Sequence, residues 1–227
     1  MSEPAFYTRV DEDTYDSTPA TASPWDESLQ HGGPPAALLA TAIEATRPDE
    51  PDFPIARITV DMLGGIPQGR MRTEVDVTRP GKRVELVEAR LHVDDRVAVS
   101  ATAWRIRQTP GSTQEHAAAP LDLPPLPDEQ PQEFFPGTSP EWGYGRAVDW
   151  RFVTGGYAAP GPASLWTRLR IPLVEGEPTS PIARMLVVAD SANGLSGELP
   201  LAEWLFIPPT LSVTVLRAPQ DEWLWFD

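Results

Sequence analysis

Two stretches of the sequence carry residues that could do chemistry, and the first surrounds Asp190. This carboxylate follows the apolar run Met185 to Val188. Such neighbours would partly desolvate the carboxylate, as is typical of side chains that act as a general base toward water. The alternative is an ordinary aspartate at a helix end, bonded to Ser191 or Asn193. The residues alone leave both interpretations open.

The second stretch, Gln30 to Gly33, reads Gln-His-Gly-Gly and directly precedes a predicted helix. The free amides and the positive dipole end of a helix N-terminus can bind a carbonyl oxygen or a phosphate, and glycine lets the backbone approach a ligand closely. His31 could donate a hydrogen bond to a substrate carbonyl. A tight turn and a merely solvated histidine are the alternatives. The candidate substrate-binding residues are His31, Gly32, Gly33 and Asn193.

The composition excludes several classes of protein. With 227 residues, of which 41% are hydrophobic, the chain can bury a core. Its net charge of -15, from 33 acidic and 18 basic residues, argues against a nucleic acid partner or an anionic membrane. The absence of cysteine excludes disulfides, thiolate nucleophiles and zinc–cysteine sites. The sequence shows no signal peptide and no run of about 18 apolar residues, which favours a cytoplasmic protein.

Other catalytic schemes lack their motifs. The chain has no Gly-x-Ser-x-Gly elbow, no His-Glu-x-x-His pair and no cluster of metal ligands in its sequence. Residues 143–148, which read GYGRAV, lack the third glycine of a dinucleotide-binding loop. We therefore expect no serine nucleophile, no metal and no other cofactor.

A proline-rich segment, residues 110–140, divides the chain into a first repeat at 1–109 and a second at 141–227. Its prolines favour a surface connection. In the first repeat, His31 to Pro48 is apolar nearly all round, which predicts a helix buried on most faces. Alternating residues after Phe53 predict a long antiparallel meander. A sheet curved around the helix is the expected arrangement.

The second repeat follows the same order. Residues 147–156 and 163–173 are predicted strands, and residues 180–194 are a predicted helix closed by Asn-Gly. Residues 211–227 align with 58–75 as strand, turn and strand. By this alignment the second sheet lacks its last two strands, so we expect either that the chain is shortened relative to its natural product or that a partner completes the sheet.

Several motifs carry a resemblance to a known family. They are GGPPAALLATAIE, ARITVDMLGGIPQG and TRPGKRVELVEARLHVDDRVAVSATA in the first repeat, and ADSANG and WLFIPPTLSVTVLRAPQDEW in the second. The chain resembles the acyl-CoA thioesterase II family, especially its actinobacterial thioesterase-like members. The resemblance implies an α+β double hotdog fold, in which each of two repeats wraps a curved antiparallel sheet around a central helix, with the second repeat incomplete at its C-terminal end.

The resemblance also implies site residues. In the family, a water molecule is held by an aspartate, a threonine and a glutamine. Asp190 matches the aspartate, whereas the threonine position falls on Pro208, with Thr210 two residues away. The glutamine has no counterpart before Asp227. The first helix has no carboxylate before Glu44, so at most one of the two related sites should work through an aspartate. The expected catalytic residues are Asp190 and Thr210.

The activity that the resemblance implies is hydrolysis of acyl-CoA to a free acid and CoA in fatty acid metabolism, by a homodimer of double hotdogs. A non-hydrolytic acyl-thioester binder or inactive scaffold is the alternative, favoured by the absent glutamine. A hotdog hydratase needs a paired aspartate and histidine, and the sequence offers no such pair near Asp190. The eight tryptophans are expected to fall in strand segments, and either to pack in the core or to line an acyl tunnel. They include Trp104, Trp166, Trp204, Trp223 and Trp225.

Overall fold

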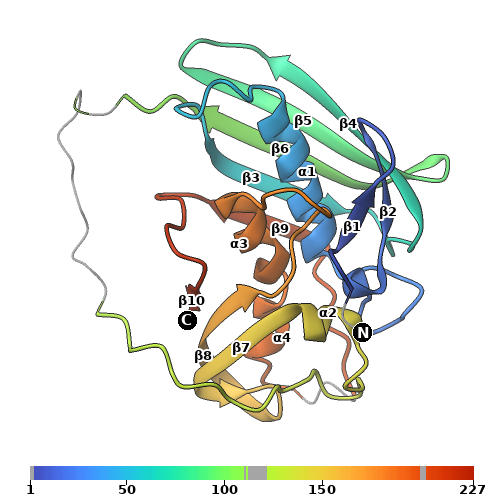
Figure 1. The fold of residues 1–227 in the computed structure, drawn as a ribbon, viewed down its shortest axis with the longest axis vertical. Helices are drawn as coiled ribbons and strands as arrows, with labels where there is room; N and C mark the ends of the chain where they lie inside the picture. Colours follow the sequence, from blue (N-terminus) through green and yellow to red (C-terminus); the bar gives the residue numbers. More distant parts are fainter. Residues whose placement is uncertain (1–2, 110, 112–121, 200–202) are drawn as a thin grey trace.

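The computed structural model describes residues 3–109, 111, 122–199 and 203–227, which form two antiparallel sheets with helices between them (Figure 1). The first sheet has the strand order β1-β2-β4-β5-β6-β3-β9, and the second has the order β10-β8-β7. Within these residues, no helix combines the length and the apolar character that crossing a membrane requires.

The strands are β1 (Tyr7–Arg9), β2 (Thr14–Ser17), β3 (Ile55–Met62), β4 (Arg70–Arg79), β5 (Val84–Val93), β6 (Arg96–Ile106), β7 (Val148–Gly156), β8 (Ala159–Leu169), β9 (Thr210–Thr214) and β10 (Leu224–Phe226). The helices are η1 (Pro19–Thr21), α1 (Gly33–Ala45), α2 (Gly143–Ala147), α3 (Pro181–Ala189) and α4 (Ala192–Leu195).

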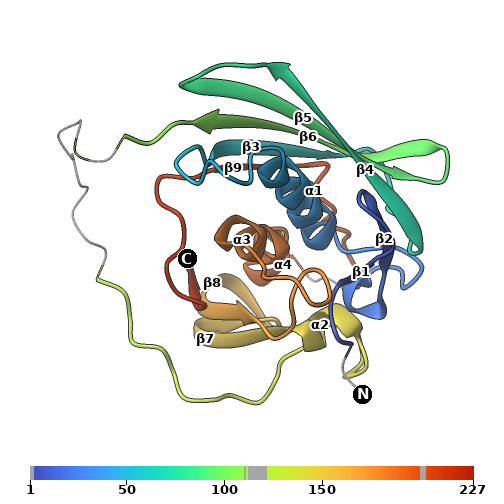
Figure 2. The same cartoon turned by 45° about the horizontal axis from the view of Figure 1, so that its top comes forward.

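Helix α1 is apolar nearly all round because protein surrounds it. Its residues 33–40 and Ile43 are buried. Figure 2 shows α1 between the seven-stranded sheet on one side and α3 on the other. Its first turn contains two prolines, which have no amide hydrogen. Amides in the first turn have no acceptor within the helix, so the prolines remove no helical hydrogen bond. The buried helix predicted between His31 and Pro48 is therefore confirmed.

The seven-stranded sheet contains strands from both halves of the chain. The meander β4, β5 and β6 follows the alternation of the sequence, with β5 buried at every second residue. Strand β9 of the second half pairs antiparallel with β3, with Ile58 opposite Val213 and Val60 opposite Leu211. The first strands of the two aligned segments therefore lie side by side, whereas their second strands, β4 and β10, belong to different sheets; the sequence did not predict this arrangement.

The two central helices approach each other closely where α1 begins and α3 ends. A β-carbon at Gly33 would overlap the main-chain carbonyl of Val187 in α3. At the opposite end of α1, the Ser180 hydroxyl, which caps α3, donates to the Glu44 carboxylate at 2.6 Å. Glycine is thus required where α1 begins, because any side chain would push the two helices apart.

The proline-rich segment is more than a surface connection. Residues 110 and 112–121 lie outside the described residues, but Pro124, Pro127 and Gln130 bond to strands of the second sheet. Gln130 bonds to both the amide and the carbonyl of Phe152 at 2.9 Å, so it covers the outer edge of β7. Phe135 is only 6% exposed and belongs to the core. The prediction of a surface connection is therefore wrong for Phe135, while the repeat boundaries stay a prediction.

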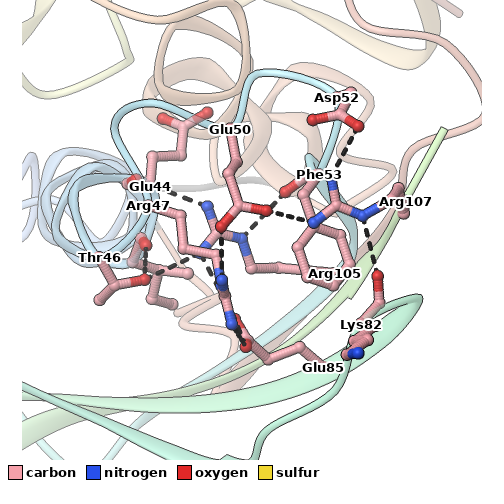
Figure 3. Close-up of polar contacts among 11 residues, drawn as sticks. Glu44, Thr46, Arg47, Glu50, Asp52, Phe53, Lys82, Glu85, Arg105 and Arg107 are labelled. Atoms are coloured by element: carbon pink, nitrogen blue, oxygen red, sulfur yellow. Dashed lines mark hydrogen bonds and ion pairs between the residues drawn. The ribbon is translucent and has the colours of Figure 1, made fainter.

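A cluster of charged side chains fixes the C-terminal end of α1 to the sheet (Figure 3). Glu85 of β5 is fully buried and accepts hydrogen bonds from Arg47 Nε at 3.1 Å and Arg47 Nη2 at 2.6 Å. Arg105 of β6, also buried, donates to the Phe53 carbonyl at 3.0 Å and to Thr46 Oγ1 at 2.8 Å. Its Nη1 lies 3.6 Å from Glu85 Oε1. The cluster joins the helix end, the following loop and two strands.

Candidate active site

Asp190 lies where α3 stops. The Ser180 hydroxyl begins this helix by accepting the Ala183 amide at 3.1 Å, and the last helical residue is Ala189. A new short helix, α4, begins at Ala192. The single helix predicted for residues 180–194 is therefore interrupted at Asp190 and Ser191. This interruption leaves the aspartate at the junction of two helices, facing the start of α1.

The Asp190 carboxylate bonds to the other repeat. Its Oδ2 accepts the Gly32 amide at 3.0 Å and lies 3.1 Å from His31 Nδ1. Its Oδ1 is buried and has no hydrogen-bond partner among the described residues. The alternative of a helix-end aspartate bonded to Ser191 or Asn193 is not what the structure shows. One oxygen is fixed by the protein, and the second is available to accept a proton.

His31 is a buried ring and not a solvated one. Its side chain is 10% exposed, and it stacks on the Tyr144 ring at a centroid distance of 3.9 Å and an angle of 6°. Burial lowers the pKa of His31, although the nearby Asp190 carboxylate opposes this shift. The expectation that no histidine lies beside Asp190 is therefore wrong, because the partner comes from the first repeat.

Counting protons shows what the His31–Asp190 pair can do. The Tyr144 hydroxyl donates to the Val187 carbonyl at 2.8 Å, so the Ser191 hydroxyl, 2.8 Å from Tyr144, gives its own proton to the Tyr144 oxygen. Ser191 Oγ can then accept from His31 Nε2, 3.5 Å away. Neutral His31 with its proton on Nε2 donates to Ser191 and accepts the Gly33 amide at Nδ1, 3.3 Å away. His31 Nδ1 and Asp190 Oδ2, 3.1 Å apart, then have no proton between them, so the pair can take up one proton there.

A cavity of about 380 Å³ opens beside this pair. Asp190, His31, Gly32 and Asn193 belong to its wall, and most of the remaining wall is apolar. The Asn193 side-chain amide donates to the Phe206 carbonyl at 3.0 Å and so holds the segment 206–209, which also lines the cavity. Four of the six predicted site residues are thus brought together around one cavity.

The other two predicted residues are placed differently. Gly33 does not line the cavity, and its amide donates to His31 Nδ1 at 3.3 Å. Thr210 is exposed at the start of β9, where it pairs with Asp61, and it does not line the cavity, whereas Pro208 does. The roles of Gly33 as a substrate contact and of Thr210 as a water-positioning residue stay predictions.

The sequence did not point to the aromatic residues of the site. Tyr144 stacks on His31 from α2, within the GYGRAV segment, which lacks the third glycine of a dinucleotide-binding loop. Trp25 and Trp142 line the cavity and lie outside the strands, so their assignment to strand segments is wrong. The same is true of Trp204, which is 54% exposed. No local pattern distinguishes cavity-lining aromatic residues from those of the core.

Stability should depend on pH through His31. Because burial keeps its pKa below the ordinary 6.5, the folded chain binds fewer protons than the unfolded chain as the pH falls through that value. This contribution to the free energy of unfolding is present above about pH 6.5 and is lost below it, by at most about 1.4 kcal/mol per pH unit. Urea denaturation of the native chain and of His31→Asn between about pH 7.5 and about pH 5 measures it. The native chain should lose more stability than the variant; parallel losses would contradict the prediction.

Two family models match the chain. The profile of the acyl-CoA thioesterase N-terminal domain matches residues 21–106, and that of the C-terminal domain matches residues 120–227. No curated protein sequence matches the chain. Together the two profiles span most of its length.

Two solved structures show the same fold. A protein from Thermobifida fusca, provisionally described as a thioesterase II, is 20% identical, with 98% of this chain and 82% of that one covered at a TM-score of 0.66. A conserved hot dog protein of unknown function from Alicyclobacillus acidocaldarius is 18% identical, with 93% and 76% covered at a TM-score of 0.65. These likenesses confirm the hotdog fold. The chain belongs to the acyl-CoA thioesterase family, and this membership places it among the thioester hydrolases.

Proposed function

We propose that the chain hydrolyses an acyl-CoA thioester to a free acid and CoA, with a water molecule activated by Asp190. The observation that carries this proposal is the Asp190 carboxylate in the cavity wall, with Oδ2 fixed by Gly32 and Oδ1 unpartnered among the described residues. A buried acceptor without a partner is costly, so a donor that binds there gains about 1–3 kcal/mol. The proton of a water molecule is such a donor.

The chemistry needs a base, a positioned water and a leaving thiolate. The water hydrogen-bonded to Oδ1 attacks the thioester carbonyl carbon while its proton passes to the His31–Asp190 pair. The carbon–sulfur bond of the tetrahedral intermediate then breaks, and the proton leaves the pair to the departing CoA sulfur. Because neutral His31 carries no proton on Nδ1, which lies 3.1 Å from Asp190 Oδ2, a proton taken up by the pair is shared between these two atoms. The water adds an OH to the acyl group and a hydrogen to the sulfur.

The substrate contacts, the cellular location, the metabolic role and the assembly of the protein are also proposals. Gly32 and Asn193 line the cavity, which supports the proposal that they contact the substrate. We place the reaction in the cytoplasm, with which the absence of cysteine is compatible. A role in fatty acid metabolism, an actinobacterial source and assembly as a homodimer remain implied by the resemblance.

A thiol-release assay tests the proposal directly. The protein is incubated with acyl-CoAs and a chromogenic thiol reagent, and catalytic release of CoA is the expected result. Tight binding of acyl-CoA without release would instead support the non-hydrolytic binder. Since His31 and Asp190 are paired, an α,β-unsaturated acyl-CoA is included. Loss of its conjugated absorbance without release of thiol would show addition of water to the double bond and would overturn the proposed hydrolysis.

A further inference from the structure

We infer that the cavity selects acyl groups that carry an aromatic ring close to the thioester, of the arylacetyl type, over long aliphatic chains. This inference rests on the proposed function and names its substrate class. It starts from the aromatic part of the cavity wall. That wall contains an aromatic set of four side chains: Trp25, Phe135, Trp142 and Tyr157.

The aromatic set is continuous with the reacting groups. The His31 ring stacks on Tyr144, and the Tyr144 ring centroid lies 5.4 Å from that of Trp142. Phe135 follows, at 6.3 Å from Trp142 and 5.0 Å from Trp25. A ring bound against this wall would therefore lie within a short linker of the Asp190 carboxylate.

The orientation of the rings suits an aromatic guest. Phe135 meets Trp25 at 78° and Tyr157 at 73°, so neighbouring rings present both faces and edges. Aromatic rings attract each other edge to face, by an amount beyond what area burial gives, and an alkyl chain gains no such contribution. The Trp142 indole donates to the Ala22 carbonyl at 2.7 Å, so its polar atom is satisfied within the protein. The wall can therefore receive an apolar ring without leaving Trp142 unpaired.

The size of the cavity sets a second limit. A cavity of about 150 Å³ holds benzene, which corresponds to roughly 25 Å³ for each packed carbon. The cavity measures about 380 Å³, so a sixteen-carbon chain at roughly 400 Å³ would fill it before the thioester was accommodated. A phenylacetyl group needs roughly 200 Å³ and leaves room for the thioester beside Asp190.

Phe135 is the residue through which the inference is tested. It contacts two other members of the aromatic set by T-shaped pairs and comes from the proline-rich segment. The substrates are phenylacetyl-CoA, octanoyl-CoA with the same number of acyl carbons, and palmitoyl-CoA. For the native chain, kcat/KM should be highest for phenylacetyl-CoA and at least about tenfold lower for palmitoyl-CoA. Phe135→Leu should lower the ratio of phenylacetyl to octanoyl kcat/KM by about 2- to 12-fold.

The matched control is Phe152→Leu. Phe152 packs on Tyr157 at 5.8 Å but does not line the cavity, so this variant should keep the native ratio even where stability falls. A native preference for palmitoyl-CoA, or an unchanged ratio in Phe135→Leu, overturns the inference. Absence of thiol release from every substrate overturns the proposed hydrolysis instead. In that event the Kd ratio for phenylacetyl-CoA and octanoyl-CoA, followed by tryptophan fluorescence in the same variants, decides the inference by the same criterion.

Discussion

Replacing Asp190 with asparagine is expected to lower kcat for acyl-CoA by about 10²- to 10⁴-fold, the range that a general base contributes. The amide has the shape of the carboxylate and keeps an oxygen that can accept the Gly32 hydrogen bond, but it cannot take the proton of water. Since the cavity wall is otherwise unchanged, KM should change far less than kcat. Thiol release at several substrate concentrations separates the two constants.

The control for this variant is Asp49→Asn, which removes an equal charge from an exposed position just beyond α1, at the end away from Asp190. It should hydrolyse acyl-CoA at the native rate. An Asp190→Asn protein that folds and retains most of the native kcat would show that another group takes the proton. Because His31 and Asp190 are in contact, the pH dependence of kcat/KM belongs to the pair and not to either residue alone.

The main elements of the fold could be predicted from short-range patterns. Residues 70–106 alternate between apolar and polar types because one face of β4, β5 and β6 is buried, and this period identifies strands. The apolar stretch of α1 predicted a helix covered on most sides, which requires a curved sheet on one side and a second layer on the other. The alternation of the strands and the apolar stretch of the helix depend only on residues close together in the chain, so a single sequence is enough to predict them.

The candidate site depends on contacts that no local pattern contains. His31 and Asp190 are 159 positions apart, and their contact follows from the close approach of α1 and α3 at Gly33. Phe135 follows a proline-rich stretch that predicts an exposed connection, yet the segment turns inward to complete the cavity wall. Asp190 could be proposed from the sequence because apolar residues precede it in the chain and because it matches the aspartate of the family that the chain resembles. Residues of the other repeat that contact Asp190, such as His31, can be identified only from the folded structure.

Glu85→Gln is expected to reduce the free energy of unfolding by about 3 kcal/mol, because removing one partner of a buried ion pair leaves the other charge uncompensated. Glu85 is 0% exposed and Arg105 is 3% exposed, so water cannot replace the charge lost beside Arg105, and the hydrogen bonds from Arg47 lose their charged acceptor. The change keeps the side-chain volume, so cavity formation does not contribute. Chemical denaturation at neutral pH should show a lower midpoint with an unchanged slope. Neither residue lines the active-site cavity, so the folded variant should hydrolyse acyl-CoA normally.

Two further variants show whether the uncompensated charge causes this loss. Glu88→Gln, on the same strand, removes a 37% exposed carboxylate bonded to Arg90 and should cost no more than about 1 kcal/mol. Glu85→Leu combined with Arg105→Met removes both buried charges and should recover much of the stability that Glu85→Gln loses, since apolar side chains can replace a buried pair at little cost. If the double variant were less stable than Glu85→Gln, the bonds of Arg105 to Phe53 and Thr46 would be the stabilising feature of the cluster, and not its pairing with Glu85.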